Sequence, residues 1–333
     1  MHTHSFLPCT DTARRNDRGM HEKLLASLSY LADTMAVIDP TLPGRFEAWS
    51  KQLSSNAHLT PDVFGGYYDI VSALEFDHRR RARRAFERIL LTQPVETGVQ
   101  IRQLQRDHAR TDARRIRRFM GSPETGAPGV RKPRKTQANA FATQLDEAFN
   151  WIEENVPDMY GEVRALIREV TLVGPEGRNH TAFEGGTCFR LWGALVLNAE
   201  RDVSVPDLIT TLAHESGHAA LFGFCQDEML VENPDSELHW SPIRQEKRPL
   251  EGIFHAAFVS ARMVWVIQRM LESEDFDIEA RLAMASDLEQ ATNVYQESAE
   301  IIRSVGKLTQ TGSAILASTE AFMSSRPDAI AAE

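Results

Sequence analysis

Apolar residues recur at intervals of three and four along most of this chain, and this spacing limits the fold more than any other feature. Leu24, Leu25, Leu28 and Leu31 begin the pattern, which places apolar side chains on one face of a helix. The same spacing predicts helices over residues 138–154, 206–224, 249–271, 278–305 and 314–323. Short β-prone runs occur at Val170–Val173, Cys188–Leu191 and Trp192–Leu197, between glycine-rich turns. We therefore predict an α+β, predominantly helical fold with a small antiparallel sheet.

Composition indicates where the chain divides. Residues 1–19 lack the apolar core of a signal peptide, so we expect a flexible tail. Residues 20–120 are predicted to be helical and are rich in arginine. Residues 121–137 combine glycine, proline and basic residues, which predicts a linker or exposed loop. Residues 138–325 follow as a metal-binding catalytic region, either separate from residues 20–120 or in one domain with them.

Hydrophobic content and cysteine usage indicate a cytoplasmic protein with a buried core. The chain has 333 residues, of which 42% are hydrophobic, enough for a large core. Its three cysteines, Cys9, Cys188 and Cys225, form no C-x-x-C pair, so neither a disulfide framework nor a cysteine zinc site is indicated. No run of 18 apolar residues occurs, and we expect no membrane span.

Positive charge is concentrated in one segment of an acidic chain. The formal net charge is −10, yet residues 77–135 hold 17 Arg and Lys against 6 Asp and Glu. Arg102, Arg106 and Arg110 are four residues apart, which would place them on one helix face open to an anionic partner such as nucleic acid or an acidic peptide. Because no nucleic-acid-binding pattern or stacking aromatic accompanies them, we favour a solvated face and expect no nucleic-acid partner.

The segment 211–224 contains the spacing His-Glu-x-x-His. Ser204 as N-cap, Pro206 in the first turn and Asp207 three residues after the cap predict the start of its helix. His214 and His218 then project from one face, where both reach a single divalent ion. Glu215 lies about 100° round the helix from His214, so its carboxylate can act on water at the ion or hold a ligand in place.

An ordinary helix is the alternative explanation of this motif. Gly217 argues against it, because glycine in a helix interior costs about 1 kcal/mol relative to alanine. Close approach of a neighbouring backbone or a substrate would account for a glycine at this position.

A third ligand is expected downstream. The helix that begins at Pro249 carries Glu251 and His255 on one face. Either side chain completes the site, and the other then orients a ligand. His180, His239 and Glu232 are weaker alternatives because they lie in predicted loops, where such residues are most often exposed.

The stretches TLAHESGHAALFGF and WSPIRQEKRPLEGIFHAAFVSARM resemble the HExxH-motif proteins encoded beside ribosomally made peptides, a group that includes 2-oxoglutarate- and iron-dependent peptide β-hydroxylases. Ser241–Arg244 and Arg248–Leu250 match the family's linker, and His255 matches its histidine position. The similarity covers about residues 187–270. Family members commonly carry glycine where this chain has Glu251, which leaves the third ligand open.

The resemblance implies an Fe(II)- and 2-oxoglutarate-dependent hydroxylase. His214, His218 and either His255 or Glu251 would bind Fe(II), and Arg248 would bind the distal carboxylate of 2-oxoglutarate. The substrate would be an unactivated carbon of a ribosomally synthesised natural-product precursor or an amino-acid-like compound. Contact between a leader peptide and the arginine-rich helices is a further hypothesis.

Two other functions remain open. The first is a zinc metallopeptidase, with a zincin-like HExxH helix next to the sheet, Glu215 as general base and Glu251 as third ligand. Residues 192–198 would then form an edge strand that aligns a peptide. The second is a nucleic-acid or partner-binding module whose metal site is inert.

Overall fold

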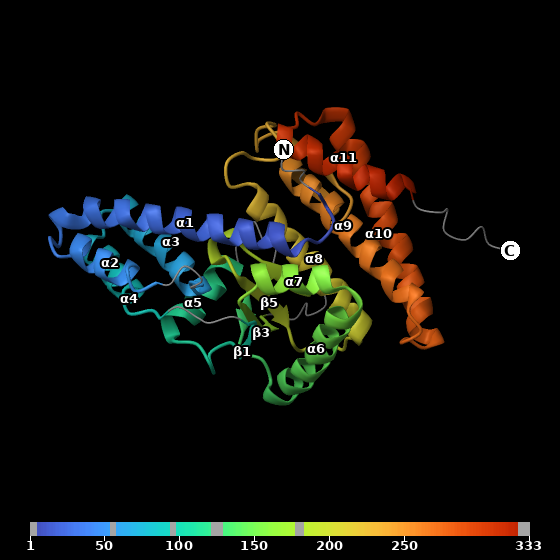
Figure 1. The fold of residues 1–333 in the computed structure, drawn as a ribbon, viewed down its shortest axis with the longest axis horizontal. Coiled ribbons are helices and arrows are strands. Elements are labelled where there is room, and N and C mark those ends of the chain that lie inside the picture. The colour runs from blue at the N-terminus through green and yellow to red at the C-terminus, as the bar shows by residue number, and fades with distance from the viewer. Residues whose placement is uncertain (1–4, 54–57, 94–97, 121–128, 177–182, 326–333) are drawn as a thin grey trace. The chain divides into compact units, whose positions relative to one another are not determined.

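The computed structural model describes residues 5–53, 58–93, 98–120, 129–176 and 183–325 (Figure 1). Contacts divide the chain into two compact units, each built from segments that are distant in the sequence. The sheet unit comprises Asp11–Thr143 and Val163–Asp202, and the helical unit comprises Met1–Thr10, Gln144–Glu162 and Val203–Glu333. This division does not follow the boundary that we expected at residues 121–137.

Helices make up most of the sheet unit. They are α1 (Thr10–Thr34), α2 (Leu42–Ser50), α3 (Pro61–Glu75), α4 (Arg79–Ile89) and α5 (Arg110–Met120), with 3-10 turns η1 (Met35–Val37) and η2 (Phe189–Leu191). Two further helices, α6 (Lys135–Asn155) and α7 (Pro157–Leu166), contribute residues to both units. α3 begins at Pro61, whose fixed φ suits the first turn of a helix.

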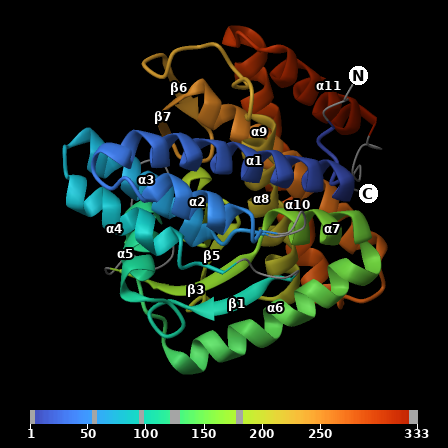
Figure 2. The same ribbon diagram turned by 60° about the vertical axis from the view of Figure 1, so that its left-hand side comes forward.

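The sheet of this unit is mixed (Figure 2). Its strands are β1 (Gln100–Gln103), β3 (Glu169–Pro175), β5 (Ala194–Asn198) and β4 (Gly185–Thr187), in the order β1-β3-β5-β4, and β2 (Val130–Arg131) pairs with the end of β3. β1, β3 and β5 run parallel, with Val170 opposite Leu195, and β4 is antiparallel to β5. Every residue of β3 and β5 is buried, as expected for parallel strands covered on both faces.

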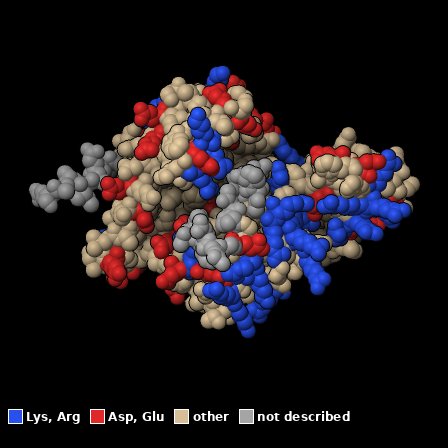
Figure 3. Space-filling view, turned by 180° about the vertical axis from the view of Figure 1, so that it is seen from behind, with Lys and Arg blue, Asp and Glu red and all other residues tan. Residues whose placement is uncertain are grey.

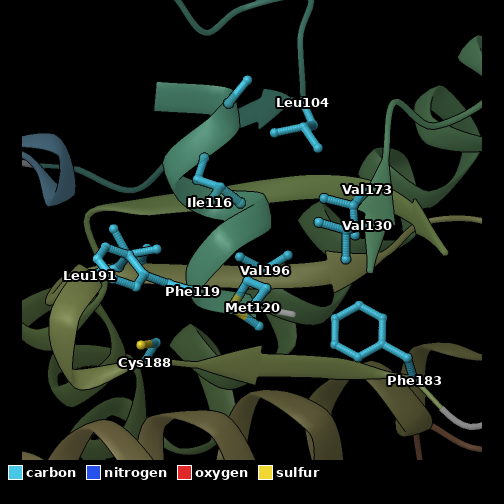
Figure 4. Close-up of a cluster of buried hydrophobic side chains, with 12 residues drawn as sticks. Leu104, Ile116, Phe119, Met120, Val130, Val173, Phe183, Cys188, Leu191 and Val196 are labelled. Atoms are coloured by element: carbon cyan, nitrogen blue, oxygen red, sulfur yellow. The ribbon is translucent and has the colours of Figure 1, made fainter. Parts of the chain in front are cut away.

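A cluster of apolar side chains joins α5 to the sheet. Figure 4 shows Met120 of α5 beside Val196 of β5 and Phe119 of α5 beside Leu191, and Ile116 belongs to the same cluster. All five are at most 4% exposed, so their burial contributes to folding of the sheet unit.

The helical unit contains α8 (Val205–Phe224), α9 (Leu250–Glu272), α10 (Ile278–Val305) and α11 (Gln310–Ser325). A two-stranded antiparallel sheet, β6 (Leu238–Ser241) and β7 (Glu246–Pro249), leads into α9 and contacts it. Among the described helices, α9 alone has the length and apolar composition of a membrane span, but 72% of that stretch is buried. Its contacts with α8 and α10 make it the core helix of this unit.

A buried ion pair holds α9 in place. The two terminal guanidinium nitrogens of Arg262, Nη1 and Nη2, donate to the carboxylate of Glu162 on α7, at 2.7 and 3.2 Å. The backbone amide of Cys9 donates to the same carboxylate at 3.2 Å. Arg262 is 1% exposed, and a buried charge needs such a bidentate partner.

The predicted fold class, α+β and predominantly helical, is confirmed. The helices expected over 138–154, 206–224, 249–271, 278–305 and 314–323 correspond to α6, α8, α9, α10 and α11. A small antiparallel sheet is present as the β6–β7 pair, but the sequence did not predict strands there. The runs Val170–Val173 and Trp192–Leu197, from which we expected it, contribute the parallel strands β3 and β5 of the mixed sheet.

Several local predictions are wrong. Residues 10–19 belong to α1 rather than to a tail, because Ala13 and Met20 lie on its buried face. Cys188–Leu191 forms a 3-10 turn instead of a strand. Within the expected linker, residues 121–128 lie outside the described residues, and the remainder contributes β2 and the start of α6.

Arg102, Arg106 and Arg110 do not share a helix face. Arg102 lies in β1, Arg106 lies in the following turn and Arg110 begins α5. β1 pairs with β3, so long-range sheet pairing overrides the local helical spacing.

Candidate metal centre

The helix that carries the motif begins where the sequence predicts. The amide of Asp207 donates to Ser204 Oγ at 3.3 Å, and the amide of Ser204 donates to the Asp207 carboxylate at 2.8 Å. This capping box, with Pro206 in the first turn, satisfies amides that a helix start leaves unpaired. It fixes the start of α8, so His214 and His218 emerge one turn apart on the same face.

α9 packs against α8 in the antiparallel direction. His214 Nδ1 lies 3.3 Å from Met263 Sδ, and His218 Nδ1 lies 2.9 Å from His255 Nδ1. Gly217 makes the approach possible, because a Cβ at this position would lie 3.3 Å from Val259 Cγ1. The glycine therefore accommodates side chains of α9, which is the kind of close approach that its presence in a helix suggested.

Three imidazoles meet at this helix pair. His214 Nε2 and His218 Nε2 are 3.1 Å apart, and the Nδ1 atoms of His218 and His255 are 2.9 Å apart. Two nitrogens that bind one zinc ion at about 2.0–2.1 Å lie about 3.3 Å from each other, so each of the two pairs, taken separately, has a spacing that suits one ion. His218 presents a different nitrogen to each neighbour, and the three rings reach one ion only after one of them turns.

The lowered pKa values of the two motif histidines suit metal binding. Burial lowers the pKa of His214 to about 4, and the charge of Arg244 and the neighbouring ring of His255 add to this effect. Burial and the neighbouring rings of His214 and His255 lower the pKa of His218 well below its usual range, with a further contribution from Arg244. Both rings are therefore neutral near pH 7, the state in which imidazole binds a metal.

The structure separates the two alternatives for the third ligand by position. His255 faces His218, whereas Glu251 lies behind His255, with Oε1 3.5 Å from His255 Nε2. This is the arrangement in which a carboxylate orients a metal-binding histidine. The other oxygen, Glu251 Oε2, is buried and has no hydrogen-bond partner among the described residues, so a polar group or ion would stabilise it.

Glu215 is buried beside the motif histidines. It is 5% exposed, and its Oε1 lies 4.0 Å from His214 Nε2, the nitrogen that faces His218. A carboxylate at this edge can accept a proton from a bound molecule or orient a ligand.

Two arginines lie on or beside the β6–β7 pair, and one of them, Arg248, was expected to bind the cosubstrate. Arg248, in β7, forms an ion pair with Glu246. Arg244, in the turn between β6 and β7, lies close enough to lower the pKa of both motif histidines. Our sequence reasoning gave a role to Arg248 and none to Arg244, although the signal was present: Arg244 ends the stretch Ser241–Arg244.

Two of the three weaker alternatives belong to the described residues, and His180 lies outside them. His239 bonds Glu237 at 3.0 Å, and Glu232 is exposed. Neither of these two side chains forms a hydrogen bond or an ion pair with the three histidines in the part of the chain that the structure describes.

A second polar cluster lies in the sheet unit, and the sequence analysis missed it. Asp17, His21 and His58 have ligand-type atoms all within 4.8 Å of one another. His21 Nδ1 bonds the backbone oxygen of Asp17 at 2.7 Å, and its Nε2 accepts from the amide of Leu59 at 3.0 Å. Both nitrogens of His21 are thus engaged.

The carboxylate of Asp17 is engaged as well. Trp192 donates to Oδ1 at 2.9 Å, while His58 and Arg168 bond Oδ2 at 3.0 and 2.8 Å. Burial opposes ionisation, but the bond to His58, the neighbouring ring of His21 and the charge of Arg168 lower the pKa of Asp17 to about 2. A cation would have to displace these partners next to a guanidinium, so this cluster is a satisfied structural network.

The comparisons with protein-family models and with curated proteins gave no match to this chain. The assignment of a function therefore rests on the three histidines and their surroundings.

Proposed function

We propose that this chain is an Fe(II)- and 2-oxoglutarate-dependent hydroxylase that acts on an unactivated carbon of a peptide or an amino-acid-like substrate. The observation that carries the proposal is the meeting of three imidazoles, two of them neutral through burial, beside the cation Arg244. Nitrogen ligands suit iron, and an arginine suits a dicarboxylate cosubstrate.

Each side chain has a separate role in this proposal. His214, His218 and His255 would hold the ion, and Glu251 would orient His255 through its Nε2. Fe(II), when bound, would supply the activation of dioxygen. Arg244 or Arg248 would bind the distal carboxylate of 2-oxoglutarate through the fork of its guanidinium group. Glu215 would orient a ligand or accept a proton beside His214 Nε2.

A zinc peptidase is the second candidate, and one observation favours it. The buried carboxylate of Glu215 lies at the Nε2 edge of His214, where a general base of such an enzyme is needed. The sheet argues against it. β5 is paired on one side with β3 and on the other with β4, so the strand that we expected to align a peptide has no free edge.

The test begins with anaerobic loading of the full chain with Fe(II), followed by 2-oxoglutarate and air. We expect one iron per chain and production of succinate, both lost in His214→Ala. His78→Ala, which changes an exposed histidine of the sheet unit, is the matched control and should keep both. No succinate, together with one bound zinc and cleavage of a generic peptide that Glu215→Gln abolishes, would establish the peptidase instead.

Two further parts of the proposal concern the setting of the enzyme. We propose a cytoplasmic location, since the three cysteines form no disulfide among the described residues. Contact of a leader peptide with the arginine-rich helices stays a prediction. Arg106 lies in the turn between β1 and α5 rather than on a helix, and Arg106→Glu should weaken binding of a substrate peptide at this turn while leaving the iron content unchanged.

A further inference from the structure

A groove of the sheet unit lies between α4 and α5 and is lined mainly by arginine. It encloses about 910 Å³. Figure 3 shows Lys and Arg side chains gathered over the part of the molecule that carries these helices. The acidic residues that line it are Asp69 and Asp77.

The arginines of the groove fall into two groups. Three have carboxylate partners: Arg79 pairs with Asp77, Arg118 pairs with Asp69, and buried Arg115 binds Asp62, Asp69 and Asp112. The others are exposed and make no ion pair with any described residue. This second group consists of Arg80, Arg81, Arg84, Arg88 and Arg114.

The described residues do not compensate the charge of this second group. Arg80, Arg84 and Arg88 repeat at four-residue intervals along α4, and like charges at this spacing destabilise a helix. Arg80 and Arg81 also lie in the first turn of α4, where the helix dipole disfavours cations. The one acidic residue of α4, Glu87, forms an ion pair with Arg83, with 3.1 Å between Glu87 Oε1 and Arg83 Nε. Because these arginines destabilise the helix that carries them, we infer that they bind an anionic partner from outside the chain.

The size and lining of the groove indicate the class of this partner. Arg80 to Arg88 spans about 12 Å of helix, and guanidinium groups bind phosphate oxygens in pairs. Apart from His78, no aromatic ring lines the groove, so it offers little for stacking nucleic-acid bases. Acidic side chains on one side of an extended peptide recur only about every 7 Å, whereas linked phosphates place their charges closer together.

We propose that the α4–α5 groove binds a small molecule that carries two or more linked phosphate groups. Arg84 and Arg88 of α4 and Arg114 of α5 hold the phosphates between the two helices. The site lies within the sheet unit and is independent of the metal centre.

Calorimetric titration of the full chain with tripolyphosphate tests the proposal. We expect one site per chain, and we expect Arg84→Gln, Arg88→Gln and Arg114→Gln each to weaken binding about tenfold, as loss of a charge-assisted bond does. Exposed positions tolerate such changes, and circular dichroism and iron content should match wild type. Arg14→Gln, at an exposed arginine of α1, is the matched control and should bind normally.

Hexaglutamate and a ten-nucleotide single strand are titrated in parallel. Weaker binding of both than of tripolyphosphate supports the site as proposed. Tighter binding of the oligonucleotide would make the groove a nucleic-acid surface, and tighter binding of hexaglutamate would make it a peptide-docking surface. Either outcome overturns the proposal, as does no binding of tripolyphosphate or equal binding by wild type and the three variants.

Discussion

Glu251 and His255 differ in what they can do although they are one helical turn apart. His255 Nδ1 faces His218 Nδ1, whereas Glu251 lies behind His255, and we proposed His255 as the ligand and Glu251 as its support. We therefore expect Glu251→Gln to keep a metal-binding site but with about 10- to 100-fold lower affinity, the usual loss when an orienting carboxylate is removed. His255→Ala should lower affinity further. Competition with a metal-binding dye measures both.

A larger loss of metal affinity in Glu251→Gln than in His255→Ala would change the assignment of the third ligand. If Glu251→Gln abolished binding while His255→Ala retained it, the carboxylate would be the third ligand. Unchanged affinity in both variants would remove these residues from the site.

Arg244 is the cation whose charge reaches the motif histidines. We expect Arg244→Gln to weaken 2-oxoglutarate binding by about 10- to 100-fold, the worth of a hydrogen bond between charged groups. The pKa of His214 should rise from about 4 because a positive neighbour is lost, and histidine NMR signals follow it. Lys247→Gln removes an exposed cation of β7 and should alter neither. If Arg248→Gln weakened 2-oxoglutarate binding and Arg244→Gln did not, Arg248 would be the residue that binds the cosubstrate.

At the scale of elements, the metal centre depends on close packing of α8 against α9. A side chain at Gly217 would press on Val259, which is 1% exposed. We expect Gly217→Val to reduce the free energy of unfolding by about 1–3 kcal/mol, as overpacking does, and to lower metal affinity. Urea denaturation measures the first effect and dye competition the second.

Val259→Ala tests whether contact with Val259 causes the loss of stability in Gly217→Val. Combined with Gly217→Val, it should restore part of the lost stability, because the added methyl groups then find space. Strictly additive losses would show that Gly217 is required for some reason other than contact with Val259.

At the scale of the whole molecule, acid stability should depend on Glu169 of the sheet unit. His108 Nε2 and Arg102 Nη1 each lie 2.7 Å from its carboxylate. Burial raises the pKa of Glu169, but the bond and charge of His108, the Thr171 hydroxyl and the Arg102 charge lower it from 4.5 to about 2. The carboxylate therefore adds stability that is complete above about pH 4.5 and is lost as the pH falls toward 2.

The contribution of Glu169 is on the order of 3 kcal/mol at neutral pH. Urea midpoints measured from pH 6 to pH 2.5 should fall more steeply for wild type than for Glu169→Gln. Glu184→Gln, which alters an exposed residue paired with Arg201, should follow wild type. Parallel pH dependence of wild type and Glu169→Gln would disprove the role of this carboxylate.

The sequence by itself determined the helices of the helical unit and the phase of the motif. Periodicity, the Ser204–Asp207 cap and the four-residue histidine spacing are local properties, and α8 realises all three. The arrangement of His214 and His218 could therefore be predicted without knowledge of the rest of the chain.

Only the tertiary structure decided which distant residues surround that motif. Helical spacing alone could not separate Glu251 from His255, because both share a face of α9, and it is the packing of α8 that brings His255 rather than Glu251 against His218. Arg244 and the interior position of β5 likewise depend on contacts between segments far apart in the chain. Local patterns fix how a segment folds, whereas its neighbours depend on packing over the whole unit.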